Sequence, residues 1–134
     1  MPPVITTTVT TTSNTEDDLI TKEIEDSKTT INKLNDKYTG LIEDLDIVQF
    51  WRDLGSEVRR LTTKRQIRIK IRSDAESLER IIIKVTNKVK EYQEAEDIGN
   101  MQQARIAKKE AILFFGQVFR RLDDVFLLLN KSNT

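Results

Sequence analysis

Residues 104–129 read ARIAKKEAILFFGQVFRRLDDVFLLL, and their apolar side chains recur at the spacing of an amphipathic helix. The main apolar stripe consists of Ala104, Ala111, Phe115, Val118, Leu122, Val125 and Leu129, and it is widened by Phe114, Phe119 and Phe126. Four of the five Phe residues of the chain lie in this stretch. We therefore expect a helix over residues 101–130 at the centre of the core.

Three leucines of the same stretch, Leu113, Leu127 and Leu128, fall outside even the widened stripe. A helix that is apolar on several sides is buried on several sides, so either further helices of the same chain or a second chain must cover them. Burying one Leu side chain contributes about 1.5–3 kcal/mol, whereas an exposed group of three invites aggregation. We expect these leucines to form a contact between subunits.

The preceding stretch predicts another helix over residues 74–97. Ser73 and Glu76 have the spacing of a capping box, in which each side chain accepts a bond from a backbone N–H of the other residue. An apolar stripe follows, made of Leu78, Ile81, Ile82, Val85, Val89 and Tyr92. Gly99 stands where a helix C-cap is expected, and so short a connection predicts that the two flanking helices are antiparallel neighbours.

A further helical region, residues 16–63, leaves one alternative open. Its apolar residues recur in steps of four, seven and three from Ile20 to Val48, as in a coiled-coil seam, and the stripe then shifts toward Trp51. Gly40 could end the helix in a left-handed cap, yet the heptad phase runs through it and no convincing N-cap follows. We favour a continuous or merely kinked helix, about 72 Å long, which would require a dimer or a filament. A break at Gly40 would instead give two shorter helices.

The first fifteen residues differ in composition from the rest of the chain. Seven of them are Thr, and no charged residue precedes Glu16. Because β-branched Thr disfavours helix and the segment has little apolar area to bury, we predict a disordered Thr-rich arm over residues 1–15. The alternative is a strand-like arm that becomes ordered on a neighbouring subunit.

A formal net charge of zero hides a division of charge between the two halves of the chain. Residues 1–57 carry five Lys/Arg against twelve Asp/Glu, whereas residues 58–134 carry seventeen against ten. Positive charge is densest in a segment that contains no carboxylate, which holds Arg59, Arg60, Lys64, Arg65, Arg68, Lys70 and Arg72. Residues 64–72 alternate between polar residues and Ile, but a lone strand has no partner here, so we expect an extended connector or a helix extension.

This basic segment, residues 59–72, permits three interpretations. The favoured one is that it pairs with the acidic first helix, through groups such as Glu43, Asp44 and Asp46, and so fixes register and partner choice. It could instead bind anionic lipid headgroups or nucleic acid, although it contains no aromatic residue to stack on bases and the pI is only about 6.4. The third interpretation is a mobile, solvated loop.

Trp51 lies beside Phe50 and Arg52, a combination that is enriched in binding hot spots. Trp51 also shares the apolar stripe with Leu54 and Val58. Core packing is therefore the favoured role of Trp51, and a contact between subunits is the alternative.

Composition excludes several classes of function. The chain contains no Cys and no His, which removes the commonest zinc ligands, the thiol and imidazole nucleophiles, and the usual general base near neutral pH. A carboxylate-only or Lys-dependent active site remains open, but the sequence has no glycine-rich phosphate loop. We expect no enzymatic activity, no metal, no cofactor and no small-molecule substrate.

No apolar run approaches the roughly 20 residues that span a bilayer, and the first residues lack the apolar core of a signal peptide. We therefore expect an intracellular protein, cytoplasmic by default.

Taken together, the sequence predicts an all-α protein, an antiparallel bundle of three or four long helices with coiled-coil-like packing over residues 16–134. Charged residues make up 33% of the chain and only four Gly and two Pro are present, which is typical of long helices. The expected function is that of a non-catalytic, self-associating scaffold, adaptor or structural subunit whose partner is protein, as a homodimer or a larger assembly. The alternative function is binding of an anionic surface, lipid or nucleic acid, through residues 59–72.

Overall fold

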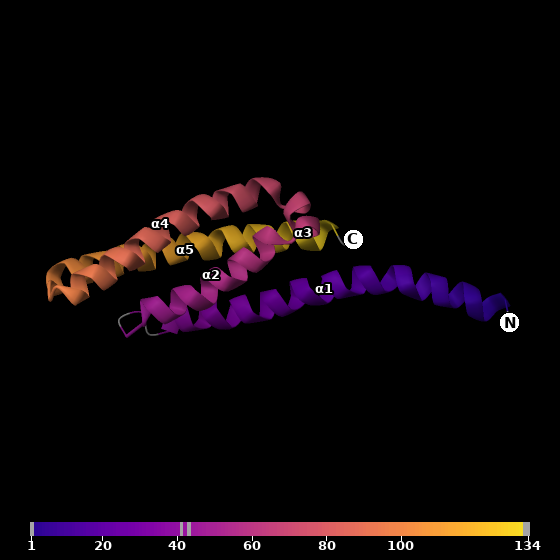
Figure 1. Ribbon diagram of the computed structural model, residues 1–134, viewed down its shortest axis with the longest axis horizontal. Helices are drawn as coiled ribbons and strands as arrows, with labels where there is room; N and C mark the ends of the chain where they lie inside the picture. The colour runs from indigo at the N-terminus through magenta and orange to yellow at the C-terminus, as the bar shows by residue number, and fades with distance from the viewer. Residues whose placement is uncertain (1, 41, 43, 133–134) are drawn as a thin grey trace.

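A computed structural model of the chain consists of five α-helices, and no strand occurs in the part of the chain that it describes (Figure 1). The structure describes residues 2–40, 42 and 44–132, and it describes side chains within 18–40, 42 and 44–130. The helices are α1 (Pro2–Gly40), α2 (Ile47–Thr63), α3 (Arg65–Lys70), α4 (Arg72–Asp97) and α5 (Met101–Ser132). The prediction of an all-α protein is therefore confirmed.

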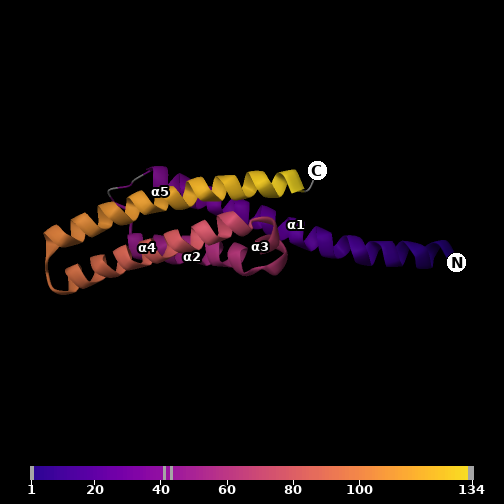
Figure 2. The same cartoon turned by 90° about the horizontal axis from the view of Figure 1, so that it is seen from above.

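The long helices form two antiparallel pairs that pack on each other. Helix α2 returns along α1, and α5 returns along α4, so that α3 lies near the end of the molecule where α5 finishes (Figures 1 and 2). Buried side chains from all five helices join in one hydrophobic cluster. The largest of the fully buried side chains include Phe50, Leu54, Leu78, Phe115 and Leu122. The position of α5 between neighbours agrees with its wide apolar stripe.

An aromatic cluster joins α1, α2 and α5 at the middle of this core. The Phe50 ring has its centroid 4.8 Å from that of Phe115, and the Tyr38 ring lies 5.3 Å from that of Phe119. Trp51 stacks on Phe115 at 6.0 Å, and its Nε1–H donates to Thr86 Oγ1 on α4 at 3.3 Å. Aromatic pairs at these distances add about 0.5–1.5 kcal/mol each beyond the area that they bury.

Asn100 and Gly99 form the turn between α4 and α5. Gly99 has φ of 75°, a left-handed conformation that residues with a Cβ rarely adopt. Its N–H donates to Glu96 O, and the N–H of Asn100 donates to Ala95 O, which is the Schellman pattern that satisfies the last carbonyls of a helix. The Asn100 side chain then accepts from Gln103 N and starts α5. The prediction of a tight turn at Gly99 is confirmed.

The continuous helix that we favoured over residues 16–63 is wrong, because α1 ends at Gly40 and α2 begins at Ile47. The sequence signal that we overlooked is Asp46. Its Oδ1 accepts from the N–H groups of Val48 at 3.2 Å and Gln49 at 3.3 Å, so it is the N-cap of α2. Leu45 and Ile47, on either side of Asp46, are both buried and hold this connection against the core.

Residues 64–72 are mostly helical, which is closer to the expected helix extension than to an extended connector, and the predicted capping box is wrong. Residues Arg65–Lys70 form the short helix α3, separated from α2 by the extended backbone of Lys64 and from α4 by Ile71. Ile67 and Ile71 are buried while Ile69 is 67% exposed, as a helix requires and a strand does not. Helix α4 begins at Arg72 with no side-chain cap, so Ser73 lies inside the helix and is not its N-cap.

The Thr-rich residues were predicted to be a disordered arm, whereas the backbone of α1 continues through them back to Pro2. Extending an existing helix costs far less than starting one, which allows a segment of poor intrinsic propensity to follow the helix that it adjoins. The side chains of residues 1–17 lie outside the described residues, so the alternative of an arm ordered on a neighbouring subunit stays a prediction.

Candidate interaction surfaces

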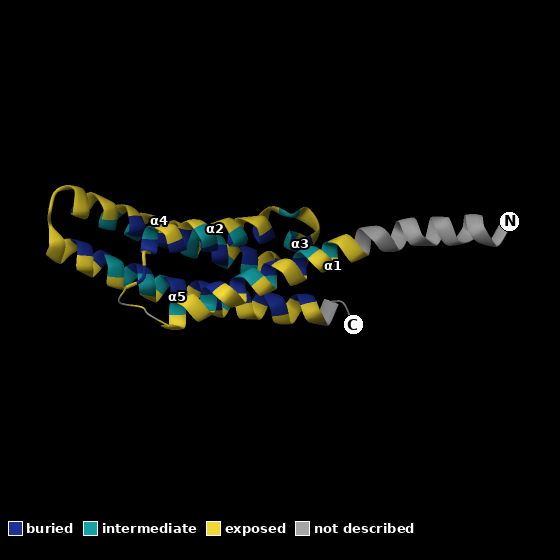
Figure 3. Ribbon diagram, turned by 90° about the horizontal axis from the view of Figure 1, so that it is seen from below, coloured by how far each residue is buried: buried dark blue, intermediate teal, exposed yellow. Residues whose placement is uncertain are grey.

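The side of α5 that faces solvent carries a row of apolar side chains. Ile106, Leu113 and Leu127 are 43%, 69% and 61% exposed, and they are spaced by seven and fourteen residues. Seven residues are nearly two helical turns, so the three side chains share one face, and we call them the outer row. The buried stripe of α5, from Ala104 to Leu129, lies on the opposite side of the helix (Figure 3). Leu128, beside the outer row, is 38% exposed.

The position between the two leucines of the outer row is occupied by Arg120, which is exposed. Lys109 and Asp124 are also exposed and lie near the two ends of the row. The face therefore carries one charged residue, Arg120, between its apolar side chains and further charged residues near the two ends of the row. The sequence pattern identified Leu113, Leu127 and Leu128 but not Ile106, although the spacing of seven residues points to it.

The structure places Trp51 in the core and away from this face. Only 8% of its surface is exposed, its ring stacks on Phe115 of α5, and its Nε1–H is bonded to Thr86 of α4. Trp51 therefore packs with the core stripe of α2, which agrees with the favoured role, while its place in an interface with a second chain stays a prediction.

The basic segment is partly neutralised by carboxylates of the same chain. Lys64 Nζ pairs with Glu23 on α1, Arg68 pairs with Glu79 on α4, and Arg60 lies 3.9 Å from Glu57 within α2. Arg68 also donates to the carbonyl of Thr62 at 3.1 Å, which ties α3 to the end of α2. The remaining members of the segment are exposed and make no ion pair with a described carboxylate; they are Arg59, Arg65, Lys70 and Arg72.

The expected pairing with the acidic first helix is thus made by a different residue from those that we named. Glu23 provides it, whereas Asp46 is used as the N-cap of α2 and Asp44 forms no ion pair within the described residues. Glu43 lies outside the described residues. Sequence alone did not indicate Glu23, because the pairing depends on how α3 is placed against α1.

Ion pairs shift the pKa of three side chains, Arg68, Glu79 and Lys88. The hydrogen bond from Arg68 lowers the pKa of the Glu79 carboxyl, and the same bond together with the charge of Glu79 raises the pKa of Arg68. Between α4 and α5, hydrogen bonds from Lys88 to Glu110 and then to Glu91 raise the pKa of the Lys88 ammonium. The Lys88–Glu110 pair spans 2.6 Å and ties the two helices together on their polar side.

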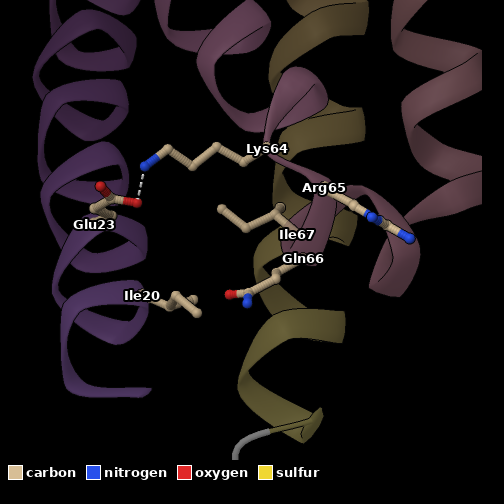
Figure 4. A pocket seen from close by; sticks show the side chains of 6 residues that line it. All are labelled: Ile20, Glu23, Lys64, Arg65, Gln66 and Ile67. Carbon is tan, nitrogen blue, oxygen red and sulfur yellow. Dashed lines mark hydrogen bonds and ion pairs between the residues drawn. The ribbon is translucent and has the colours of Figure 1, made fainter. Parts of the chain in front are cut away.

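A pocket of about 200 Å³ lies between α1 and α3 (Figure 4). Ile20 and Ile67 give it an apolar wall, and the Glu23–Lys64 ion pair crosses its rim (Figure 4). Arg65 points away from α1 (Figure 4). Lys64 faces α1 at the rim and is already paired with Glu23. This pocket therefore offers little positive charge to an anionic ligand.

A second hollow, of about 370 Å³, lies along α2 and is lined by Trp51, Arg52, Gly55, Ser56 and Arg59. The sequence pattern identified Arg59 as a candidate anion-binding residue but not Arg52 or Ser56. The signal that would have found them is the spacing, since two Arg residues seven apart flank two small residues on one side of a helix.

Neither a metal-ligating cluster nor a membrane-spanning helix occurs in the described residues. No group of three or more acidic side chains there is arranged to hold a metal ion. No helix in the same part of the chain combines the length and the apolar character needed to cross a membrane. No family model matches the chain, and comparisons with curated proteins and with solved structures return no match.

Proposed function

We propose that this chain is a non-catalytic, self-associating helical scaffold or structural subunit, and that copies of it pair through the solvent-facing side of α5. The observation that carries the proposal is the outer row. Its three large apolar side chains stand at heptad spacing on the side of α5 that the chain itself leaves open. Full burial of such a side chain contributes about 1.5–3 kcal/mol, so covering the exposed parts of all three on each copy favours association.

The charged residues of this face favour an antiparallel pair of α5 helices. In a two-fold arrangement centred between Leu113 and Arg120, Ile106 of one copy meets Leu127 of the other, and Leu113 meets the apolar stem of Arg120. The same register sets Lys109 opposite Asp124, which provides the acidic-to-basic complementarity. A parallel pair would instead bring the two Arg120 guanidinium groups together, and like charges at such a position are destabilising. Within each copy, the long helices form the antiparallel bundle with coiled-coil-like packing.

The test compares the self-association of two variants by sedimentation velocity. Leu113→Glu combined with Leu127→Glu places two carboxylates in the outer row, and we expect it to reduce the chain to a monomer. Ile83→Glu is the matched control, since Ile83 is 62% exposed on α4 and lies off the row. An association that survives the double substitution, or that Ile83→Glu weakens equally, would show that α5 is not the contact.

A further inference from the structure

The hollow along α2 combines unpaired positive charge with open space. Arg52 and Arg59 are both exposed, and neither forms an ion pair with a described carboxylate. Gly55 and Ser56 lie between them, and their small size leaves the hollow unfilled. We infer that Arg52, Ser56 and Arg59 form a binding site for a phosphate monoester, on a face of the molecule that the proposed self-association does not use.

The spacing of the two arginines allows both to reach one phosphoryl group. Seven residues advance a helix by about 10.5 Å and return the side chain to nearly the same angle. A guanidinium at the end of a three-carbon stem can lean toward the middle of that span from either side. Each presents several N–H donors in a fixed fork, which suits the several oxygens of a phosphate dianion.

The Ser56 hydroxyl lies between the two arginines and supplies a third donor. In the free chain it donates to the backbone carbonyl of Arg52 at 2.7 Å. Rotation about its Cα–Cβ bond turns the hydroxyl from that carbonyl toward the hollow, because a Ser side chain has three staggered positions. Its contribution is smaller than that of either arginine, since the bond to the carbonyl is given up when it turns.

Carboxylates close in sequence do not compete for these arginines. Asp53 Oδ1 accepts a hydrogen bond from Gln49, and Glu57 lies beside Arg60. Neither lines the hollow. The comparable hollow between α4 and α5 differs in this respect, because Asp124 is part of its lining and Arg121 is engaged by both Asp74 and Asp124. The α2 hollow therefore keeps its positive charge for an external anion.

Trp51 gives the site an apolar floor and a built-in reporter. Gly55 has no side chain, so the indole lies next to the open space; a Cβ at this position would stand 3.4 Å from the indole Cε2 and Cζ2 atoms. An organic group attached to the phosphate would lie against this ring. Because Trp51 is the single Trp of the chain, a change in intrinsic Trp fluorescence on binding reports a change around this ring.

The experiment titrates the full chain with phenyl phosphate, followed by calorimetry and by Trp51 fluorescence, at constant ionic strength set with sodium chloride. We expect saturable binding, with Kd raised about tenfold or more by Arg52→Gln and by Arg59→Gln. Arg105→Gln removes an exposed arginine of α5 and is the matched control, which we expect to bind as the unaltered chain does. Ser56→Ala is expected to weaken binding by a smaller factor with no change in folding.

Titrations with two further ligands identify which kind of molecule carries the phosphate group. Vesicles that contain phosphatidic acid present the same monoester on a lipid, and a single-stranded oligonucleotide without a terminal phosphate presents only diesters. Binding of phenyl phosphate, or of the vesicles in its place, with loss in both α2 variants supports the site. The assignment is overturned if neither monoester binds, if Arg105→Gln weakens binding as much as Arg52→Gln does, or if only the oligonucleotide binds.

Discussion

At the scale of single residues, Phe50 lies where three helices of the core meet. It is fully buried and its ring lies near those of Tyr38, Phe115 and Phe119, so it joins α1, α2 and α5 at one point. Gly116 belongs to the same contact, because a Cβ there would stand 2.9 Å from the Tyr38 hydroxyl. The close approach of α1 to α5 therefore needs both a large ring and a missing side chain.

Truncating Phe50 is expected to be severely destabilising. Phe50→Ala removes a buried ring and leaves a cavity, which costs about 3–5 kcal/mol of the free energy of unfolding. Ile83→Ala on the exposed side of α4 is the control and should change it by less than about 0.5 kcal/mol. Urea denaturation followed by circular dichroism measures both. If both variants lost the same free energy of unfolding, the aromatic cluster would not be a main source of stability.

The ion pair between Arg68 and Glu79 makes stability depend on pH in a defined direction. The pKa of Glu79 is lowered in the folded chain, so the pair contributes stability above the usual carboxyl pKa of 4.5 and loses it as the pH falls through the lowered value. Glu79→Gln should therefore be less stable than the unaltered chain near neutral pH, and the difference should shrink on acidification. Denaturation at about pH 7 and about pH 3 tests this, with Glu94→Gln as the control.

At the scale of elements, helix ends decide how the chain is divided. The apolar periodicity of all the long helices was predictable, because burial of one helix face imposes a repeat of 3.6 residues. The boundaries near Gly40 and Ser73 were not, since a cap depends on backbone angles that side-chain spacing does not fix. Asp46 forms a cap while Ser73, in a better sequence context, does not. The placement of Lys64 against Glu23 likewise depends on tertiary packing.

Removing the cap of α2 should cost a measurable part of the stability. Asp46→Ala leaves the N–H groups of Val48 and Gln49 without their acceptor, which costs about 0.5–2 kcal/mol. Asp46→Asn retains a side-chain acceptor and should be close to neutral. Thermal and urea unfolding distinguish the two variants. If Asp46→Ala were as stable as Asp46→Asn, the cap would not hold the start of α2.

The two glycines near helix ends should respond differently to alanine. Gly99→Ala forces a Cβ into the left-handed conformation and is expected to cost about 1–2 kcal/mol. A Cβ added at Gly40 would meet no atom within 4 Å, and Gly40 does not have a positive φ, so Gly40→Ala should be neutral or stabilising by up to about 1 kcal/mol. Urea denaturation measures both variants. A loss of stability in Gly40→Ala similar to that in Gly99→Ala would contradict this account of the two turns.

At the scale of the whole molecule, the chain covers one side of α5 and leaves the outer row on the other. The apolar excess on this helix was predictable from sequence, since Leu113, Leu127 and Leu128 lie outside the stripe that the core buries. The division of charge between the halves was less informative, because the described ion pairs join residues within and between halves according to local packing. The hollow on α2 was not predictable from sequence for the same reason, because it depends on which side of that helix the other helices leave uncovered.

The most direct test of self-association is the mass of the unaltered chain in solution, measured by light scattering over a range of concentrations at low and at high salt. The proposed contact is mainly apolar, so we expect a mass that rises with concentration from 15.5 kDa to at least twice that value, and that does not fall when salt is added. A mass that stays at that of a single chain at every concentration and salt would contradict the account.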